Sequence, residues 1–529
     1  MAEERDPSFT ILEYTGDHSA HKCGYCKSVA GSFSHGMWAH RMAVGDYQDL
    51  IDRGWRRSGK YCYKPTMNRT CCPLYTIRCD ASEIRLTKGQ KKVLKRVHRY
   101  LSHGDIKPEG GKIPDNEQCV SPTGNQEYVK PKFDTTKDLS MVSVSPAAIK
   151  NAKGTCTASA REPNCSISGE VLPVDGSVDS NSHSQNSGKV IQPVRGNDTR
   201  NLSPKSPHQV AGPDPSKPPC RKSKLIRLER REAKLAKRRE EASSRGESLM
   251  EVTKSKSSNN TPKSLEDFLN EPLPESPAHK LEVKLVRSHP GSMGFVQTFG
   301  IAHKVYQKYQ INIHGDSPDR CSESQFRRFL CNSPLEPWHP GCGPLSGYGS
   351  FHHQYWLDDR LIAVGVLDIL PHCVSSVYLY YDPEFSFLSL GTYASLRELA
   401  LTRELQRTAA ALKWYYMGFY IHSCPKMRYK GNYSPSFLLC PETYIWVPIE
   451  KATPKLDLAE YSRLNEDTSA RDYYGEVDLN RIKILYDQDL ILYEMYQRLN
   501  PKGDDEDEVK EYASLVGAKS AHSMVLYRG

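Results

Sequence analysis

The stretch from Asp134 to Asp267 contains no Phe, Trp or Tyr, although the 529-residue chain has 13 Phe, 6 Trp and 30 Tyr. A segment without aromatic side chains has too little apolar surface to offset the entropy lost when a chain becomes ordered. We therefore predict a disordered linker over residues 106–262 and folded parts at residues 1–105 and 263–529. A chain of this length is also expected to need more than one core.

One part of this linker carries a high density of charge. Arg221–Glu241 contains Arg and Lys throughout, and Leu225, Leu228 and Leu235 are spaced for one face of a helix. We predict a helical segment that binds an import receptor or RNA, and the alternative is a solvated charged tether.

The whole chain carries a mild positive charge of +9. It has no run of about 18 apolar residues, which predicts no membrane partner. Its charged N-terminus is not followed by the apolar segment of a secretory signal. We expect a location in the cytoplasm and nucleus, where most cysteines stay reduced.

Four cysteines near the N-terminus have the spacing of a metal site. Cys23 and Cys26 form a C-x-x-C pair, and Cys71 and Cys72 follow 45 residues after Cys26. Four thiolates suit zinc or an iron–sulfur cluster. Adjacent side chains point apart, so Cys71 and Cys72 need a bend to share one ion. The alternative is that one of them is only buried, and that the fourth ligand comes from a nearby side chain: Cys62, Cys79 or His40.

Cations alternate with aromatic rings between residues 53 and 64. Cations suit phosphates, and rings suit unpaired bases such as those of a tRNA 3′ end. We predict that Trp55, Arg56, Arg57 and Lys60 contact nucleic acid. A predicted helix at residues 91–101 adds a basic face with Lys91, Lys92 and Lys95. Ordinary solvated charges are the alternative for both segments.

The C-terminal part alternates strands with a helix, which predicts an α/β (α+β) fold. The order is a hairpin, a strand, a long helix and a strand, and the last three elements form a parallel βαβ unit. The ranges are Gly349–Leu357, Leu361–Leu370, Val374–Asp382, Leu390–Leu412 and Trp414–Ile421, with a further strand at Tyr444–Ile449. The acidic run Asp504–Glu508 is expected to be a loop.

Several long motifs in both folded parts closely resemble the eukaryotic arginyl-tRNA–protein transferase family. They are Gly347–Leu357, Leu361–Pro371, Ser375–Pro383, Cys23–Lys27, Gly54–Pro65 and Cys71–Pro73. The resemblance implies an acyltransferase domain of the N-acetyltransferase (GNAT) type, preceded by a small cysteine-rich metal or iron–sulfur module. It also implies transfer of arginine from Arg-tRNA to proteins with N-terminal Asp, Glu or oxidised Cys, which marks them for ubiquitin-dependent degradation.

The segment before the long helix differs from that of coenzyme A enzymes. GNAT enzymes that bind acetyl-coenzyme A have a glycine-rich pyrophosphate loop there. Ser386–Tyr393 contains a single glycine, which favours an aminoacyl-tRNA donor. Two alternatives stay open: an acetyl-coenzyme A-dependent N-acetyltransferase, and a non-enzymatic, metal-stabilised protein that binds nucleic acid.

The transfer reaction needs proximity and a proton acceptor. We predict Asp368, the single acid in an apolar strand, as the base, with Tyr378 and Tyr380 to position or relay. Recognition of the transferred arginine, or a loop cap, is the alternative for Asp368, and core packing is the alternative for the tyrosines.

The acidic acceptor or the tRNA end needs polar partners beside the same cleft. The hairpin offers His352, His353 and Gln354, and a short predicted helix at Ser324–Leu330 offers Arg327 and Arg328. For the hairpin residues, an ordinary place on a strand edge is the alternative.

Overall fold

The computed structural model describes residues 8–104 and 263–529, except 17, 18 and 502, together with Asp6 and a few positions between 149 and 236. The described N-terminal and C-terminal segments belong to one compact unit. The predicted linker, with its basic segment Arg221–Glu241, lies almost wholly outside the described residues.

An eight-stranded mixed sheet forms the centre of the unit, in the order β14-β13-β5-β12-β11-β10-β9-β8. Every strand predicted between residues 349 and 449 is present, and β11 and β12 are parallel as expected. The bounds are β5 Tyr75–Asp80, β8 Leu281–His289, β9 Gly349–Leu357, β10 Arg360–Ile369, β11 Cys373–Tyr381, β12 Trp414–Tyr420, β13 Ser436–Leu439 and β14 Trp446–Pro448. The mixed α/β class is thereby confirmed.

Two long helices cover this sheet. Helix α6 (Met293–Tyr309) packs on β8, β10 and β11, and α8 (Leu390–Gln406) packs on β11 and β12. Helix α8 ends six residues before the predicted Leu412, because successive turns at Arg407, Ala409 and Leu412 lead the chain to β12. Strand β10 is buried almost throughout, as expected for a strand covered on both faces.

The predicted boundary between an N-terminal module and a C-terminal domain differs from the structure. Strand β5, from the N-terminal segment, lies between β12 and β13 of the C-terminal segment. A second sheet has the order β3-β4-β2-β1-β17-β15-β16-β6-β7, and its β1 pairs in parallel with β17 near the C-terminus. Both sheets therefore contain strands from both ends of the chain, which local sequence patterns do not reveal.

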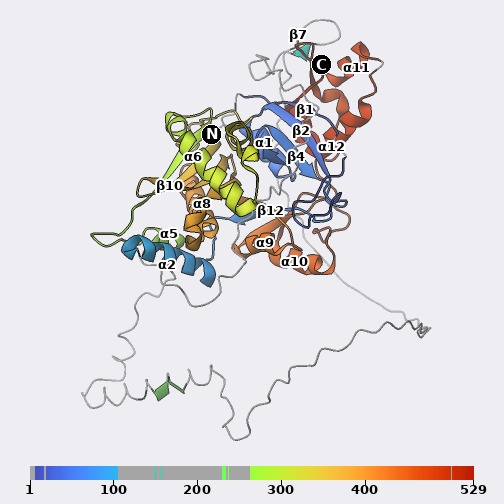
Figure 1. The fold of residues 1–529 in the computed structure, drawn as a ribbon. Helices are drawn as coiled ribbons and strands as arrows, with labels where there is room; N and C mark the ends of the chain where they lie inside the picture. The colour runs from blue at the N-terminus through green and yellow to red at the C-terminus, as the bar shows by residue number, and fades with distance from the viewer. Residues whose placement is uncertain are drawn as a thin grey trace, which may run out of the picture. The chain divides into compact units, whose positions relative to one another are not determined.

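The strands of the second sheet are short. They are β1 Ile11–Tyr14, β2 Ser34–Arg41, β3 Arg56–Ser58, β4 Tyr61–Pro65, β6 Ile149–Lys150, β7 Cys156–Thr157, β15 Lys483–Tyr486, β16 Asp489–Leu492 and β17 Val525–Tyr527. Figure 1 shows the red C-terminal helices α11 (Tyr493–Leu499) and α12 (Glu506–Ser523) beside the blue strands β1 and β2.

The remaining α-helices are α1 Val44–Ile51, α2 Lys88–His103, α5 Leu265–Leu269, α7 Glu323–Phe326, α9 Pro425–Arg428 and α10 Ile449–Leu458. Of these, α9 and α10 contact strands of the central sheet, whereas the others pack mainly on neighbouring helices. The predicted helix at residues 91–101 is confirmed as part of α2, which begins with a capping box between Thr87 and Gln90 and ends at Gly104 in the left-handed region. Figure 1 shows α2 beside α5 and α8.

The acidic run Asp504–Glu508 is not a loop throughout, because α12 begins at Glu506. Carboxylates are favourable in the first turn of a helix, where the backbone N–H groups are unpaired. Arg528 adds ion pairs with Asp505 at 3.0 Å and with Glu508 at 2.7 Å. Among the described residues, no helix has the length and apolar character needed to cross a membrane.

Candidate functional site

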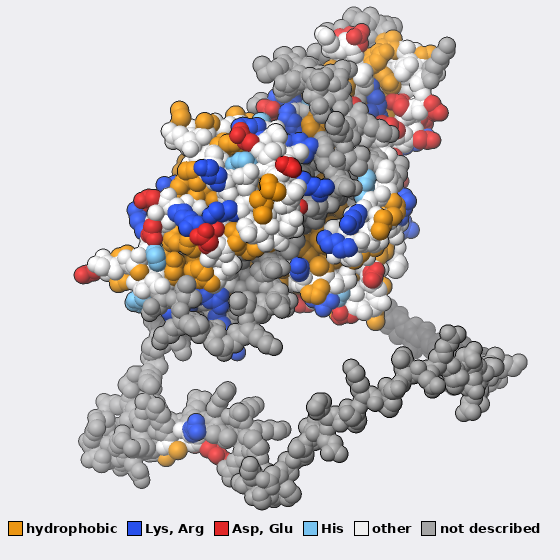
Figure 2. Space-filling view, in the orientation of Figure 1, with side chains coloured by type: hydrophobic (Ala, Val, Ile, Leu, Met, Phe, Trp, Pro, Cys, Tyr) orange, Lys and Arg blue, Asp and Glu red, His pale blue; other side chains and the backbone are white. Residues whose placement is uncertain are grey.

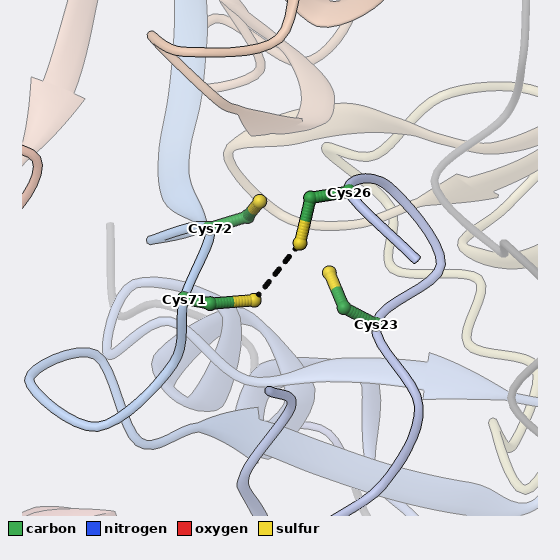
Figure 3. Close-up of side chains that lie close together, drawn as sticks. All are labelled: Cys23, Cys26, Cys71 and Cys72. Carbon is green, nitrogen blue, oxygen red and sulfur yellow. Dashed lines mark hydrogen bonds between the residues drawn. The ribbon is translucent and has the colours of Figure 1, made fainter. Parts of the chain in front are cut away.

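Two loops bring the four predicted metal ligands together. The Sγ atoms of Cys23, Cys26, Cys71 and Cys72 lie within 4.8 Å of one another and point toward a common centre (Figure 3). Four thiolates around one zinc ion at about 2.3 Å would stand about 3.8 Å apart, so the set fits a tetrahedral metal. The Cys26 and Cys71 sulfurs are 3.2 Å apart.

The loop backbones explain how these cysteines meet. Lys27 adopts a positive φ of 67°, which lets the Cys23 N–H donate to the Ser28 carbonyl at 2.8 Å and closes the C-x-x-C turn. On the other loop, the Cys71 N–H donates to the Gly31 carbonyl at 2.8 Å. A hydrogen bond from the Ser28 backbone lowers the pKa of Cys26 to about 7, which favours the thiolate form that binds metals.

The alternative ligands lie elsewhere. Cys62 and Cys79 are buried in β4 and β5, and His40 lies 3.3 Å from the Glu13 carboxylate. By contrast, Cys23 and Cys72 pack against Ile421 and Met427, just beyond the end of β12. The candidate metal centre therefore lies against Ile421, the residue that follows β12, and Met427 of α9.

The predicted base Asp368 is fully buried and already paired. Arg57 holds it in a bidentate ion pair, with Nε 2.7 Å from Oδ2 and Nη2 2.5 Å from Oδ1, and the Ser350 hydroxyl donates to Oδ1 at 2.7 Å. A carboxylate with these three donors and no exposed surface is not placed to accept a substrate proton. Arg57, predicted to bind tRNA, instead joins β3 to β10 through this ion pair.

The two predicted tyrosines belong to the core between β11 and α6. The Tyr378 hydroxyl donates to Gln310 Oε1 at 2.8 Å, and the fully buried Tyr380 ring packs edge-on against Tyr306 and Phe326. This arrangement is the packing alternative rather than a relay.

The three polar residues of β9 are also buried. His352 Nε2 lies 3.0 Å from the Leu330 carbonyl, His353 Nδ1 lies 3.1 Å from the Tyr355 hydroxyl, and the Gln354 amide donates to Thr298 at 2.7 Å. Burial lowers the pKa of His352 to about 4 and that of His353 to about 3, so both imidazoles are neutral at pH 7. Helix α6 contributes to this burial, since Phe295 packs edge-on against His352 and Thr298 accepts the hydrogen bond from Gln354.

The predicted cations of the short helix remain near the surface. Arg327 forms an exposed ion pair with Glu323 at 3.1 Å and lies over the Phe299 ring, and Arg328 bonds Gln325. Arg327 is therefore accessible to a ligand in a way that the β9 residues are not.

The predicted nucleic-acid surface divides into two parts. Trp55 is fully buried and donates to the Leu515 carbonyl at 3.3 Å, Arg56 is buried, and Lys60 bonds the His40 carbonyl at 3.3 Å. On α2, Lys92 and Lys95 are exposed and Lys91 is half-buried. Figure 2 shows Lys and Arg side chains at several separate places on the face in view.

The parallel strands β11 and β12 separate along their length. They pair at only three positions, Cys373 to Ser375 with Trp414 to Tyr416, and both strands continue beyond this point. Each strand carries an irregularity near this point. On β11, Val377 has no partner on β10. On β12, the register of pairing with β5 shifts around Gly418, whose φ is 67°. Bulges bend strands, so the two strands open into a V.

Comparisons with known proteins agree with this architecture. The family description "Arginine-tRNA-protein transferase, N terminus" matches residues 21–92, and "Arginine-tRNA-protein transferase, C terminus" matches residues 302–440. Arginyl-tRNA–protein transferase 1 of Drosophila melanogaster is 41% identical over 98% of this chain and 99% of its own length. The chain belongs to the arginyl-tRNA–protein transferase family.

Two further relatives extend the comparison within and beyond this family. Arginyl-tRNA–protein transferase 1 of Arabidopsis thaliana is 36% identical over 85% of this chain and 75% of its own length. The aspartate/glutamate leucyltransferase of Campylobacter jejuni is 31% identical over 18% of this chain and 38% of its own length. In this transferase family, the N-terminal match contains all four metal-site cysteines, and the C-terminal match contains the opening between β11 and β12.

One polar residue of this region was missed from the sequence. Glu398 of α8 is 1% exposed, and the Tyr415 hydroxyl donates to its Oε2 at 2.6 Å. A signal was present, because Glu398 lies four residues after Ala394 and four before Thr402, on the buried side of the helix.

Proposed function

We propose that this chain transfers arginine from Arg-tRNA to the α-amine of proteins that begin with Asp, Glu or oxidised Cys, and so marks them for ubiquitin-dependent degradation. The near full-length match to the Drosophila arginyl-tRNA–protein transferase carries the proposal. The Campylobacter relative, named as an aspartate/glutamate leucyltransferase, supports acidic acceptors.

The chemistry requires little beyond positioning. The donor is an activated ester, and a free α-amine has a pKa of about 7.7–8.0, so a fraction is neutral at physiological pH. Holding amine and ester together supplies most of the rate. The opening between β11 and β12 supports this role, since parallel strands that separate expose backbone groups to an extended donor.

The four cysteines of the candidate metal centre would hold zinc or an iron–sulfur cluster. The bound metal would supply a structural cross-link between the two loops, close to the end of β12. This cross-link is suited to stabilise the central sheet.

The deciding experiment compares donors and acceptors. Purified protein is incubated with labelled Arg-tRNA and peptides that differ only in their first residue. We expect transfer to Asp, Glu and oxidised Cys peptides, weak transfer to an Ala peptide, and none from acetyl-coenzyme A. Transfer from acetyl-coenzyme A, or equal transfer to all peptides, would contradict the proposal.

The basic face of α2 is proposed to contact the tRNA backbone. Replacing Lys91, Lys92 and Lys95 with Ala should weaken Arg-tRNA binding, because up to three phosphate contacts are lost. Each phosphate contact contributes about 0.7–0.9 to the steepness with which log affinity falls against log salt concentration. The fall should therefore become less steep by about 2 in the triple variant. Filter binding at several salt concentrations measures this.

A lysine on another helix provides the control. Lys510→Ala removes an exposed cation of α12 and should leave the slope unchanged. An unchanged slope in the triple variant would exclude α2 from the tRNA interface.

We also propose that Arg221–Glu241 binds an import receptor and distributes the protein between cytoplasm and nucleus. The density of Arg and Lys in this segment supports the proposal. A fluorescent fusion without these residues should lose its nuclear fraction, and an unchanged distribution would contradict this role.

A further inference from the structure

A buried carboxylate lies behind the opening between β11 and β12. Glu398 of α8 accepts a hydrogen bond from the Tyr415 hydroxyl of β12 at 2.6 Å. Ser376 of β11 lies close enough to lower the pKa of Glu398. On β10, a Cβ at Gly365 would lie 2.6 Å from Glu398 Oε1. The glycine therefore leaves the space that this carboxylate occupies.

The bulge at Val377 determines where Ser376 points. Tyr378 pairs opposite Val366 and bonds Gln310, the residue that follows α6. In a regular strand Ser376 would lie on the same face as Tyr378. Because Val377 is an extra residue in β11, Ser376 instead turns to the α8 face and meets Glu398.

Ser376 also lies at the apex of the opening. It directly follows Ser375, the last β11 residue that pairs with β12. Ser376 and Val377 are partly exposed, whereas Glu398 and Tyr415 are buried. A serine side chain at the accessible apex thus lies near a carboxylate that has almost no exposed surface of its own.

The surroundings of Glu398 contain polar groups but no ion pair in the described part of the chain. Strand β9 contributes the neutral His353 and the Tyr355 hydroxyl. On the other helices that pack against α8, Arg96 of α2 bonds Phe387 and Ser389, and Glu266 of α5 pairs with Arg403.

The charges next to Glu398 on its own helix do not neutralise it either. Arg397 bonds the Tyr393 hydroxyl at 2.9 Å. Burial raises the pKa of Glu398 to about 7, while Tyr415 and Ser376 oppose this rise. A carboxyl group in this state can both accept and release a proton near neutral pH.

We propose that Glu398 is the proton acceptor of the transfer reaction and acts through the hydroxyl of Ser376. The inference rests on the proposed arginyl transfer. As the acceptor nitrogen attacks the ester carbonyl, the C–N bond forms and an amine proton passes to Ser376 Oγ, whose own proton moves to Glu398. The ester C–O bond then breaks, and the ribose oxygen leaves with a proton returned along the same path.

The first test is Glu398→Gln, which keeps the size and the acceptor oxygen for Tyr415. We expect kcat for transfer from Arg-tRNA to an Asp peptide to fall about 100-fold or more, as for loss of a general base. The KM for Arg-tRNA should change little. The wild-type rate should rise as Glu398 ionises at about pH 7 and rise again as the acceptor amine loses its proton at about pH 7.7–8.0, and the variant should keep only the second rise.

Stability provides a readout that separates this role from a structural one. Folding raises the pKa of Glu398 above its ordinary value of 4.5, so its contribution to stability decreases as pH rises through the interval up to about 7. The Gln variant lacks this decrease. Its melting temperature at pH 8 should therefore equal or exceed that of the wild type.

Two further variants locate the path. Ser376→Ala should reproduce the loss of kcat while Glu398 remains in place. Thr402→Val, one turn further along the buried side of α8, is the matched control and should keep the wild-type rate. Wild-type kcat and pH dependence in Glu398→Gln would overturn the inference, as would a loss of rate that simply follows a lower melting temperature. Absence of any transfer by the wild type would instead contradict the proposed function.

Discussion

Cys71→Ser is expected to lose its metal, to melt at a lower temperature and to transfer arginine slowly. Removing one of the four thiolates leaves three ligands. Because a structural metal site forms only in the folded protein, weaker metal binding lowers the free energy of unfolding. Because Cys23 and Cys72 pack against Ile421 and Met427, the disturbance should reach the end of β12. Elemental analysis, thermal melting and the transfer assay measure the three effects.

Single substitutions at Cys23, Cys26 and Cys72 should have the same effect, since all four sulfurs converge. The visible absorption of the wild type distinguishes an iron–sulfur cluster from colourless zinc. Cys342→Ser, at an exposed position, is the control. Cys424→Ser is a stricter one, because Cys424 packs beside the cluster but is not among the four converging sulfurs. Full metal content in Cys71→Ser would exclude this residue as a ligand.

The second large effect is expected at the buried ion pair. Arg57→Leu leaves the Asp368 carboxylate without its partner in a fully buried place. Breaking a buried pair by removing one partner costs about 3–5 kcal/mol of unfolding free energy. Urea unfolding should show this loss in the single variant.

The double variant Arg57→Leu with Asp368→Leu should recover part of the stability, because no charge remains buried. Arg498→Leu, which breaks the exposed pair with Glu494, should cost only about 0.5 kcal/mol. A loss below about 1 kcal/mol in Arg57→Leu would show that water or another group compensates Asp368.

The sequence predicted those parts of the fold that depend on local pattern. Strands β9 to β12 and helix α8 follow from apolar spacing and turn residues, and the four cysteines follow from their spacing. The position of β5 could not be predicted this way, because its partners β12 and β13 lie more than 300 residues later in the chain.

The candidate site was harder to predict, since residue type alone does not reveal a partner. Asp368 in an apolar strand suggested a base, and Arg57 in an aromatic run suggested a phosphate ligand. The ion pair between Arg57 and Asp368 explains why both charged side chains are buried. Glu398 was missed because an acid within a helix is more often solvated, and its spacing from Ala394 and Thr402 was a weak signal that the packing of α8 on β11 and β12 makes plain.

The pairing of β1 with β17 has a consequence for how the protein is made. Ile11 lies beside Val525, so β1 has no neighbour on that side until the segment that contains β17 has been synthesised. Domains generally fold as they emerge during synthesis. The N-terminal segment should therefore stay incompletely folded until β17 is available, and a nascent chain arrested before β15 should remain sensitive to protease.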